Sequence, residues 1–334
     1  MGPAIARSAR RAVVQRFSDV TGIPVLAMES PRGVNDPSLR LAAMQMPKAD
    51  VVLLLGKRLD FALRFGEPPA FAPDCRFVQI DPDAFALTPG GRVTMAEAAD
   101  PAAALEALDV MAQTMTWRHQ AWAKEVAASQ RTEPAGWDEL RRSSRRPLHP
   151  LRVCAALQPL LDDDAVLVCD GGEFGQWTQA GLTARTRLIN GLSGSIGSAI
   201  PMACAAKLAR PGSRVVTVLG DGTFGFHAFE LDTAVRHRLP ILTVVGNDAR
   251  WNAEHQLQVR HYGAERAVGC QLLPSRYDAL AEALGAHGEF VERADDLGPA
   301  LDRALASGLP ACVNVAIEGV AAPEYCTGGV GTNT

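Results

Sequence analysis

Short apolar runs rich in Val, Ile and Leu alternate with longer amphipathic or Ala-rich stretches along the chain. Apolar runs without polar alternation are typical of parallel strands that helices cover on both faces. The pattern therefore predicts an α/β protein with two doubly wound parallel-sheet domains joined by a linker.

The first part of the chain predicts a small α/β domain over residues 1–115. We expect its strands at 23–28, 51–55 and 76–80, and its helices near 4–21, 39–47 and 101–114. Residues 116–149 follow as a linker, because they hold a cluster of arginines followed by Pro147 and Pro150 but no strand-like run. Pro150 suits the first turn of a helix, where its missing N–H is not needed. The second domain is therefore expected to begin at residue 150.

This second domain is predicted to span residues 150–320, followed by a Gly- and Thr-rich tail over 321–334. Its expected strands are 165–169, 186–189, 214–219, 241–245 and 311–317, and its expected helices are 150–162, 174–182, 196–210, 224–237, 275–285 and 296–307. Loops that contain glycine follow four of these strands. Ligands of doubly wound sheets bind at such carboxyl ends, so we expect the functional site there.

Composition excludes several classes of function. The 334 residues carry 33 basic and 37 acidic side chains, a formal net charge of −4, so neither nucleic acid nor an anionic membrane is an expected partner. No apolar run approaches the ~18–20 residues of a membrane span. The seven cysteines lack CxxC spacing and lie mostly in apolar stretches, which is typical of reduced core thiols and predicts a cytoplasmic location.

Two loops carry the candidate metal ligands. Asp221 follows an apolar strand between two glycines, and Asp248 and Arg250 follow the next strand. Mg²⁺ takes about six oxygens at ~2.1 Å and commonly uses one or two carboxylates, with the rest from phosphates, water and carbonyls. The carboxylates of Asp221 and Asp248 and the carbonyl of Arg250 are therefore the expected metal ligands.

Several segments resemble, in the correct order, the diphosphate-binding domain of the thiamine-diphosphate-dependent enzymes of the acetolactate synthase, 2-keto acid decarboxylase and 2-hydroxyacyl-CoA lyase superfamily. These are CDGGEFGQW at 169–177, NGLSGSIGSAIPMA at 190–203 and the segment with GDG at 215–248. The resemblance implies the cofactors thiamine diphosphate and Mg²⁺, with Asp221 as the metal aspartate. Asp248 stands where the family has Asn, which keeps a metal-binding oxygen but adds a negative charge beside the diphosphate.

The same resemblance implies contacts with the cofactor from the loops after the strands. The residues are Gly172, Glu173, Ser193, Gly194, Ser195, Ile196, Gly197, Gly220, Asp221, Gly222, Thr223, Asp248 and Trp251. It also implies that His255 and Gln256 face the substrate or the cofactor. Glycines in these loops let backbone N–H groups approach a diphosphate closely.

The first domain resembles the family's middle domain through residues 49–66 and 77–84, and the segment GPAIARS at 2–8 resembles the loop after that domain's first strand, so the resemblance implies that this first strand is absent. Some members hold FAD or ADP in this domain, and the match would place Gly56, Arg58 and Asp60 at a turn near the nucleotide. Asp81, at a strand end, would accept hydrogen bonds from a ribose. The alternative is a purely structural domain.

The superfamily's pyrimidine-binding domain, which carries the glutamate that activates the cofactor, has no counterpart among these motifs. The resemblance therefore implies a homo-oligomer, a separate chain that carries the pyrimidine-binding domain, or both, and it leaves the catalytic residue unknown. The implied activity is C–C bond lyase or ligase chemistry on 2-keto acids, as in acetolactate synthase. The alternatives are a 2-hydroxyacyl-CoA lyase acting on an acyl-CoA, a 2-keto acid decarboxylase, and a non-catalytic cofactor-binding subunit or truncated remnant.

Overall fold

The computed structural model describes residues 1–88, 90–117, 120–191 and 193–325. The described chain divides into two compact units: unit 1 is Met1–Glu133 with Glu324 and Tyr325, and unit 2 is Pro134–Pro323. Part of the predicted tail, with Cys326, lies outside the described residues. The boundaries drawn from the sequence at 115/116 and 149/150 stay a prediction.

Unit 1 contains a three-stranded parallel sheet in the order β1-β2-β3. Its strands are β1 (Val51–Leu55), β2 (Arg76–Asp81) and β3 (Val93–Ala98), and its helices are α1 (Pro3–Ala6), α2 (Ala12–Thr21), α3 (Pro101–Ala112) and α4 (Gln120–Arg131), with 3₁₀ segments at Gly33–Asn35, Pro37–Lys48, Phe61–Gly66 and Ala84–Ala86. Two buried apolar clusters, one including Phe17 and Leu105 and the other Leu39 and Phe77, form its core.

Unit 1 corrects three expectations. Residues 23–28 are not a strand, and the extended chain there forms no ladder with a named strand among the described residues. The helix expected at 4–21 is broken into α1 and α2, and Ser8 Oγ between them accepts the N–H of Arg10 at 3.1 Å, a local bond that competes with helix formation. The helix expected at 39–47 is a 3₁₀ segment interrupted at Arg40, whose φ is +50°.

Unit 2 contains a six-stranded sheet, parallel throughout, in the order β5-β4-β6-β7-β9-β8. Its strands are β4 (Val166–Cys169), β5 (Thr186–Ile189), β6 (Val215–Gly220), β7 (Leu242–Asn247), β8 (His287–Val291) and β9 (Ala311–Ala316). Its helices are α5 (Trp137–Arg142), α6 (Pro150–Leu157), α7 (Gly172–Gly181), α8 (Ala199–Ala209), α9 (Asp221–His227), α10 (Glu230–Arg236), α11 (Asn252–Tyr262), α12 (Tyr277–Ala283) and α13 (Ala294–Ala306), with 3₁₀ turns at Gln158–Leu160 and Ala264–Arg266.

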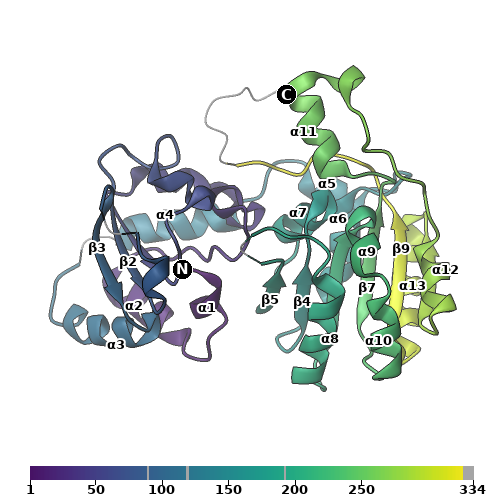
Figure 1. Ribbon diagram of the computed structural model, residues 1–334, viewed down its shortest axis with the longest axis horizontal. Helices are drawn as coiled ribbons and strands as arrows, with labels where there is room; N and C mark the ends of the chain where they lie inside the picture. The colour runs from purple at the N-terminus through teal and green to yellow at the C-terminus, as the bar shows by residue number, and fades with distance from the viewer. Residues whose placement is uncertain (89, 118–119, 192, 326–334) are drawn as a thin grey trace. The chain divides into compact units, whose positions relative to one another are not determined.

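Successive residues of each central strand of unit 2 belong to different apolar cores. Val218 and Val244 pack with Leu157 of α6 and Leu301 of α13, whereas the next residue along each strand packs with α8 and α10. Figure 1 shows α8 and α10 running alongside the strands. Helices therefore cover both faces of the sheet, and the prediction of an α/β protein with parallel sheets is confirmed. The helix expected at 224–237 is instead two helices, α9 and α10.

The strand order places a topological switch point between β4 and β6. The chain leaves β4 toward β5 on one side and returns to β6 on the other, so the loops after β4 and β6 diverge from adjacent strand ends. Ligands of open α/β sheets bind in the crevice formed at such a point. The fold thus predicts a ligand site at the loops that begin at Asp170 and Gly220.

Two further expectations concern the cysteines and the membrane. The six cysteines among the described residues are buried and form no disulfide, as expected for core thiols. Across the part of the chain that the structure describes, no helix combines the length and apolar character needed to cross a bilayer.

Candidate functional site

A pocket in unit 2 lies at the carboxyl ends of β4, β6 and β7. Its lining consists of Gly172, Glu173, Phe174, Ile196, Gly220, Asp221, Gly222, Thr223, Gly246, Asp248, Arg250, Trp251, Asn252, Ala253 and Glu254. Ten of these residues were expected from the sequence, and they come from the segments at the carboxyl ends of four strands, β4, β5, β6 and β7. The pocket therefore lies at the switch point of the sheet.

Two carboxylates, one buried and one half-buried, define the polar part of this pocket. Asp221 begins α9 with 1% of its surface exposed, and its Oδ2 accepts the Arg250 N–H at 3.2 Å. Burial raises the pKa of Asp221 to about 6. Burial, and then the charge of Asp221, raise the pKa of Asp248 to about 7. The pocket therefore destabilises the anionic form of each carboxylate, and a bound cation would stabilise that form.

The donor set fits a hard divalent cation such as Mg²⁺, which prefers oxygen ligands. Among the described residues, no group of three or more His, Cys, Asp or Glu side chains is placed to hold a metal ion. Two carboxylates and one main-chain carbonyl would leave about half of the six octahedral positions to other oxygens. The donor set therefore suits a metal that is bound together with a phosphorylated ligand.

The loop after β7 is held in place by its neighbours. Ala249 has a φ of +52°, a left-handed conformation that non-glycine residues rarely adopt. Its C=O accepts the Leu272 N–H at 2.8 Å, and the Trp251 N–H donates to the Cys270 C=O at 2.8 Å. These bonds fix the loop that carries Asp248 and the Arg250 carbonyl.

Trp251 packs on the first turn of α9. A Cβ atom added at Gly222 would lie 2.7 Å from Cε3 of the Trp251 ring, so that position accepts only glycine without movement. The Trp251 ring also makes an edge-on contact with Phe226, with ring centroids 5.8 Å apart. The second glycine of the GDG motif is thus explained by close packing of the two loops.

The loop after β4 brings Glu173 into the pocket lining, but its carboxylate already has protein partners. Glu173 Oε1 accepts the Ala322 N–H at 3.1 Å, and Oε2 accepts a hydrogen bond from the Gln176 side chain. Gly172 precedes it with a φ of +82°. The predicted role of Glu173 toward the cofactor stays a prediction.

Asp170 is a residue of this site that the sequence analysis missed. It is fully buried, and its carboxylate accepts the N–H groups of Gly171 at 2.7 Å, Gly197 at 3.1 Å and Ala199 at 2.8 Å. Burial raises the pKa of Asp170, and these N–H groups oppose that rise. On the other side of the loop, His227 Nδ1 lies 2.8 Å from the Gly197 C=O. An acidic residue directly at the end of a buried strand was the available signal.

The structure brings only part of the predicted Gly-rich loop to the pocket. Ile196 lines it, whereas Ser193, Gly194, Ser195 and Gly197 are not among the lining residues. Gly197 has a φ of +98°, and a Cβ atom there would lie 2.6 Å from Cβ of Phe226. Direct contacts of these four residues with a diphosphate stay a prediction.

Helix α11 contributes different residues from those expected. Asn252, Ala253 and Glu254 line the pocket, but His255 and Gln256 do not. The Gln256 side chain donates to Asn252 Oδ1 at 3.1 Å and to the Gly319 C=O at 3.2 Å. Gln256 therefore supports a lining residue, and its predicted role toward substrate stays a prediction.

The nucleotide candidates of unit 1 lie at the carboxyl ends of β1 and β2. Gly56, after β1, has a φ of +57°. Asp81 Oδ1 accepts the Asp83 N–H at 3.0 Å, and Asp60 Oδ1 accepts the Ala62 N–H at 3.0 Å. Arg58 forms an exposed ion pair with Asp83 at 3.3 Å. These side chains stabilise local turns, and their role toward FAD or ADP stays a prediction.

Comparison with known proteins agrees with this geometry. Residues 170–315 match the C-terminal TPP-binding domain of thiamine pyrophosphate enzymes, and residues 1–108 match the central domain of the same enzymes. Thiamine pyrophosphate, or TPP, is another name for thiamine diphosphate. The first match begins at Asp170 and includes the whole pocket lining.

Relatives with curated names are similar over most of the chain. The chain is 37% identical over 313 residues to the acetolactate synthase large subunit IlvG of Mycobacterium tuberculosis and to a probable acetolactate synthase of Mycobacterium bovis, covering 91% of this chain and 56% of each relative. It is 30% identical over 294 residues to 2-hydroxyacyl-CoA lyase 2 of Bos taurus, covering 83% of this chain and 45% of that protein. The chain thus spans about half the length of these relatives.

The two domain matches, their order along the chain and the pocket at the switch point of unit 2 agree with one another. The chain therefore belongs to the thiamine pyrophosphate enzyme family, of which it carries the central domain and the C-terminal TPP-binding domain.

Proposed function

We propose that the pocket of unit 2 binds the diphosphate of thiamine diphosphate together with Mg²⁺. The observation that carries the proposal is the pair of carboxylates in one pocket, the buried Asp221 and the half-buried Asp248, whose pKa values are raised by burial and, for Asp248, also by the charge of Asp221. Two such groups are unfavourable as neighbouring anions unless a cation joins them. Mg²⁺ with a diphosphate supplies both the cation and the additional oxygens.

In this proposal each loop of the pocket has a defined task. Asp221, Asp248 and the Arg250 carbonyl hold the metal, and the loop that contains Ile196 approaches the diphosphate. Asp170 positions that loop through its backbone hydrogen bonds. Thiamine diphosphate, when bound, supplies a carbon nucleophile and an electron sink for breaking and forming C–C bonds next to a carbonyl group. The chain's own residues bind and orient the cofactor.

We further propose that the enzyme to which this chain contributes acts on 2-keto acids in the manner of acetolactate synthase. Support comes from the 37% identity to proteins with that name, which extends over 91% of the chain. A 2-hydroxyacyl-CoA lyase acting on an acyl-CoA is the second candidate, supported by the 30% identity to a protein with that name.

The proposal also covers the pyrimidine-binding domain, a nucleotide in unit 1 and the location of the protein. The domain matches cover the family's central and C-terminal domains, so we propose that the pyrimidine-binding domain is contributed by another polypeptide within an oligomer. We propose FAD or ADP binding by unit 1 only on the basis of its match to the family's central domain. The candidate carboxylates Asp60 and Asp81 accept hydrogen bonds within local turns and give this proposal no separate support. A cytoplasmic location is proposed from the buried thiols, which are typical of reducing compartments.

Calorimetric titration tests the cofactor proposal directly. Purified chain is titrated with thiamine diphosphate in Mg²⁺ and again in EDTA, and the same is done for Asp221→Ala. The matched control is Asp302→Ala, which removes an exposed carboxylate on α13. We expect metal-dependent binding that Asp221→Ala abolishes and the control retains. Equal binding by both variants, or binding that persists in EDTA, would show that these carboxylates do not form the site.

A further inference from the structure

A series of three buried polar side chains leads from α12 to the loop after β7. Its members are Asp278, in the first turn of α12, Asn314, in β9, and Asn247, at the end of β7. Helix α12 lies beside β9 (Figure 1). Each of the three residues exposes 7% or less of its surface, and none of them is among the lining residues of the candidate cofactor pocket. Polar groups buried to this extent need hydrogen-bond partners.

Hydrogen bonds join the three side chains one after another. Asn314 donates through Nδ2 to Asp278 Oδ1 at 3.1 Å and accepts through Oδ1 from Asn247 Nδ2 at 3.2 Å. Both Nδ2 groups also donate to the Ser275 C=O at 3.0 Å. At the other end of the series, Asn247 Oδ1 accepts the Ala249 N–H at 3.2 Å. The series therefore ends on the residue whose φ is +52°.

The carboxylate of Asp278 gives this series one direction. Burial would raise the pKa of Asp278, but hydrogen bonds from Arg276 and Asn314 outweigh burial, and the pKa lies below its ordinary value. At neutral pH the group is therefore an acceptor only. An amide that donates to it through Nδ2 must turn its oxygen toward the next amide, which then presents its own Nδ2 there. Together with the Ser275 C=O, the carboxylate thus turns the Asn247 oxygen toward the loop after β7.

The backbone at Ala249 decides how the two candidate metal ligands on this loop are directed. A left-handed conformation is unfavourable for a residue with a Cβ atom, so its neighbours must hold it. Burial raises the pKa of Asp221, and the groups that oppose this rise include the N–H groups of Arg250 and Ala249. A change of φ and ψ at Ala249 would turn the Arg250 carbonyl relative to the Asp248 carboxylate and would move both N–H groups away from Asp221.

We propose that Asp278 is a positioning residue of the metal site. Through the two asparagines it holds Ala249 in the left-handed conformation, and this conformation directs the Arg250 carbonyl toward the cation. Asp278 does not line the pocket, so it acts only through its neighbours. The effect on affinity rests on the proposed binding of Mg²⁺ and thiamine diphosphate, whereas the effect on the backbone can be measured without either ligand.

Hydrogen exchange in EDTA tests the series in the absence of ligand. In Asp278→Asn the new amide can turn either its oxygen or its NH₂ group toward Asn314, so the direction of the series is no longer fixed. We expect exchange of the Ala249 amide to become about tenfold faster, while the amide of Val244 in β7 keeps its wild-type rate. The matched control is Arg276→Gln, which removes the exposed partner of Asp278 and leaves the carboxylate bonded to Asn314.

Metal affinity, measured with a rescue variant, tests the link to the proposed site. Mn²⁺ is the probe, and its EPR signal gives its dissociation constant in the presence of thiamine diphosphate. We expect Asp278→Asn to weaken Mn²⁺ binding by about tenfold and Arg276→Gln to change it by less than about twofold. In the Ala249→Gly background a left-handed backbone needs no support, so Asp278→Asn should weaken binding there by less than about threefold. General instability would lower the affinity equally in both backgrounds.

The outcomes separate this inference from the cofactor proposal. Unchanged exchange of the Ala249 amide in Asp278→Asn, or the same acceleration in Arg276→Gln, would overturn the inference. An equal loss of Mn²⁺ affinity with and without Ala249→Gly would overturn it as well. If the wild-type chain binds no Mn²⁺ with thiamine diphosphate, the cofactor proposal fails first. Faster Ala249 exchange in Asp278→Asn would then confine Asp278 to the backbone of this loop, without a role in metal binding.

Discussion

At the scale of single residues, Asp248 is the side chain whose surroundings most change its chemistry. Its pKa is raised to about 7 by burial and by the charge of Asp221, so in the chain without metal it holds a proton up to neutral pH. An asparagine at the same position would keep one oxygen for a metal and would never carry the charge. The substitution Asp248→Asn therefore separates metal ligation from electrostatic repulsion.

Asp248→Asn should change the pH dependence of stability. The folded-state pKa values of Asp221 and Asp248, about 6 and about 7, lie above the ordinary value of 3.8. The folded chain therefore binds more protons than the unfolded chain between about pH 4 and pH 7, and both groups lower the free energy of unfolding as pH rises through that range. In EDTA, Asp248→Asn should raise this free energy by about 1–3 kcal/mol at pH 7.5 and change it little at pH 4.

Urea unfolding at pH 4, 6 and 7.5 measures this effect, with Asp302→Asn as the control for loss of an exposed carboxylate. If wild type and Asp248→Asn lose stability in parallel as pH rises, the carboxyl of Asp248 is not held protonated by its surroundings.

Gly197 is a second residue whose identity follows from its backbone. Its φ of +98° and the 2.6 Å approach of Phe226 Cβ leave no place for a side chain. Gly197→Ala should lower the free energy of unfolding by about 1–3 kcal/mol, because the loop must move or remain strained. Gly212→Ala is the matched control, since nothing lies within 4 Å of its added Cβ. Thermal denaturation compares the two, and equal midpoints would contradict the assigned strain.

At the scale of elements, Asp170 joins the end of β4 to the start of α8. Its carboxylate accepts N–H groups from Gly171, Gly197 and Ala199, which belong to two different loops. Asp170→Asn leaves one acceptor oxygen and places a side-chain NH₂ donor against backbone N–H groups that are donors themselves. It should therefore lower the free energy of unfolding by about 2–3 kcal/mol, as for loss of buried hydrogen bonds to a charged group.

The same substitution should weaken thiamine diphosphate binding more than overall folding would explain, because the loop with Ile196 loses its anchor. Calorimetric titration at a temperature where the variant is fully folded measures this, and Asp163→Asn, an exposed carboxylate next to β4, is the control. Unchanged affinity in folded Asp170→Asn would limit Asp170 to a role in stability.

The elements also show which parts of the fold the sequence reveals. Strands β4, β6, β7 and β9 are buried on both faces, so their apolar runs are unmistakable. Strands β3 and β8 lie at sheet edges; most residues of β3 are exposed and most residues of β8 are only partly buried. Polar residues such as Thr94 and Glu289 therefore break the apolar pattern, and neither strand was predicted. Residues 23–28 are apolar like a strand, but among the described residues they form no ladder with a named strand.

In the candidate site, too, some residues could be predicted from the sequence and others could not. Asp221 and Asp248 could be predicted because a short motif places each directly after a buried strand. Asp170 was missed although it stands at an equivalent strand end, because its function is to bind backbone N–H groups and these come from a loop far along the sequence. His255 was predicted to face the pocket from its position after the metal loop. The pocket lining includes the first three residues of α11, Asn252, Ala253 and Glu254, and the role of His255 stays a prediction.

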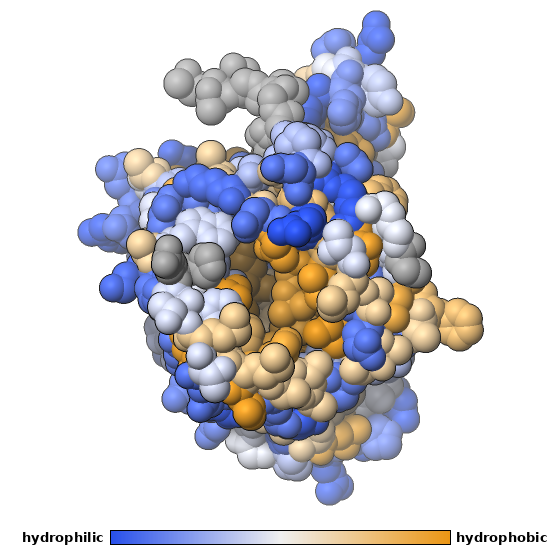
Figure 2. All heavy atoms as spheres, turned by 90° about the vertical axis from the view of Figure 1, so that its left-hand side faces the viewer, coloured by the Kyte–Doolittle hydropathy of each residue, from blue (hydrophilic) through white to orange (hydrophobic). Residues whose placement is uncertain are grey.

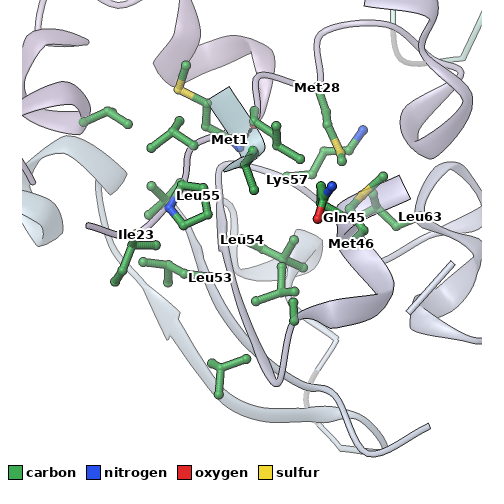
Figure 3. A pocket seen from close by; sticks show the side chains of 18 of the residues that line it. Met1, Ile23, Met28, Gln45, Met46, Leu53, Leu54, Leu55, Lys57 and Leu63 are labelled. Carbon is green, nitrogen blue, oxygen red and sulfur yellow. Dashed lines mark hydrogen bonds between the residues drawn. The ribbon is translucent and has the colours of Figure 1, made fainter. Parts of the chain in front are cut away.

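At the scale of the whole molecule, the chain has two units with separate apolar cores. The whole lining of the candidate cofactor pocket belongs to unit 2, and an apolar cavity beside β1, seen as a hollow in Figure 2 and from close by in Figure 3, is lined wholly by residues of unit 1. A ligand stabilises the folded state of the part that binds it, by an amount set by its concentration relative to the dissociation constant. The two cavities should therefore respond to different additions.

Scanning calorimetry tests this separation. Thiamine diphosphate with Mg²⁺ at about 100 times its dissociation constant should add about 2.7 kcal/mol to the stability of unit 2, which corresponds to a rise of roughly 5–10 °C in its transition. The transition of unit 1 should stay within about 1 °C, because none of its residues lines the pocket. Limited proteolysis during heating assigns each transition, since cleavage before or after residue 134 distinguishes the units. Asp221→Ala should remove the shift of unit 2 while leaving unit 1 as it was. If both transitions rise together and both lose the rise in Asp221→Ala, the two units unfold as one cooperative body, and the cofactor stabilises unit 1 through unit 2.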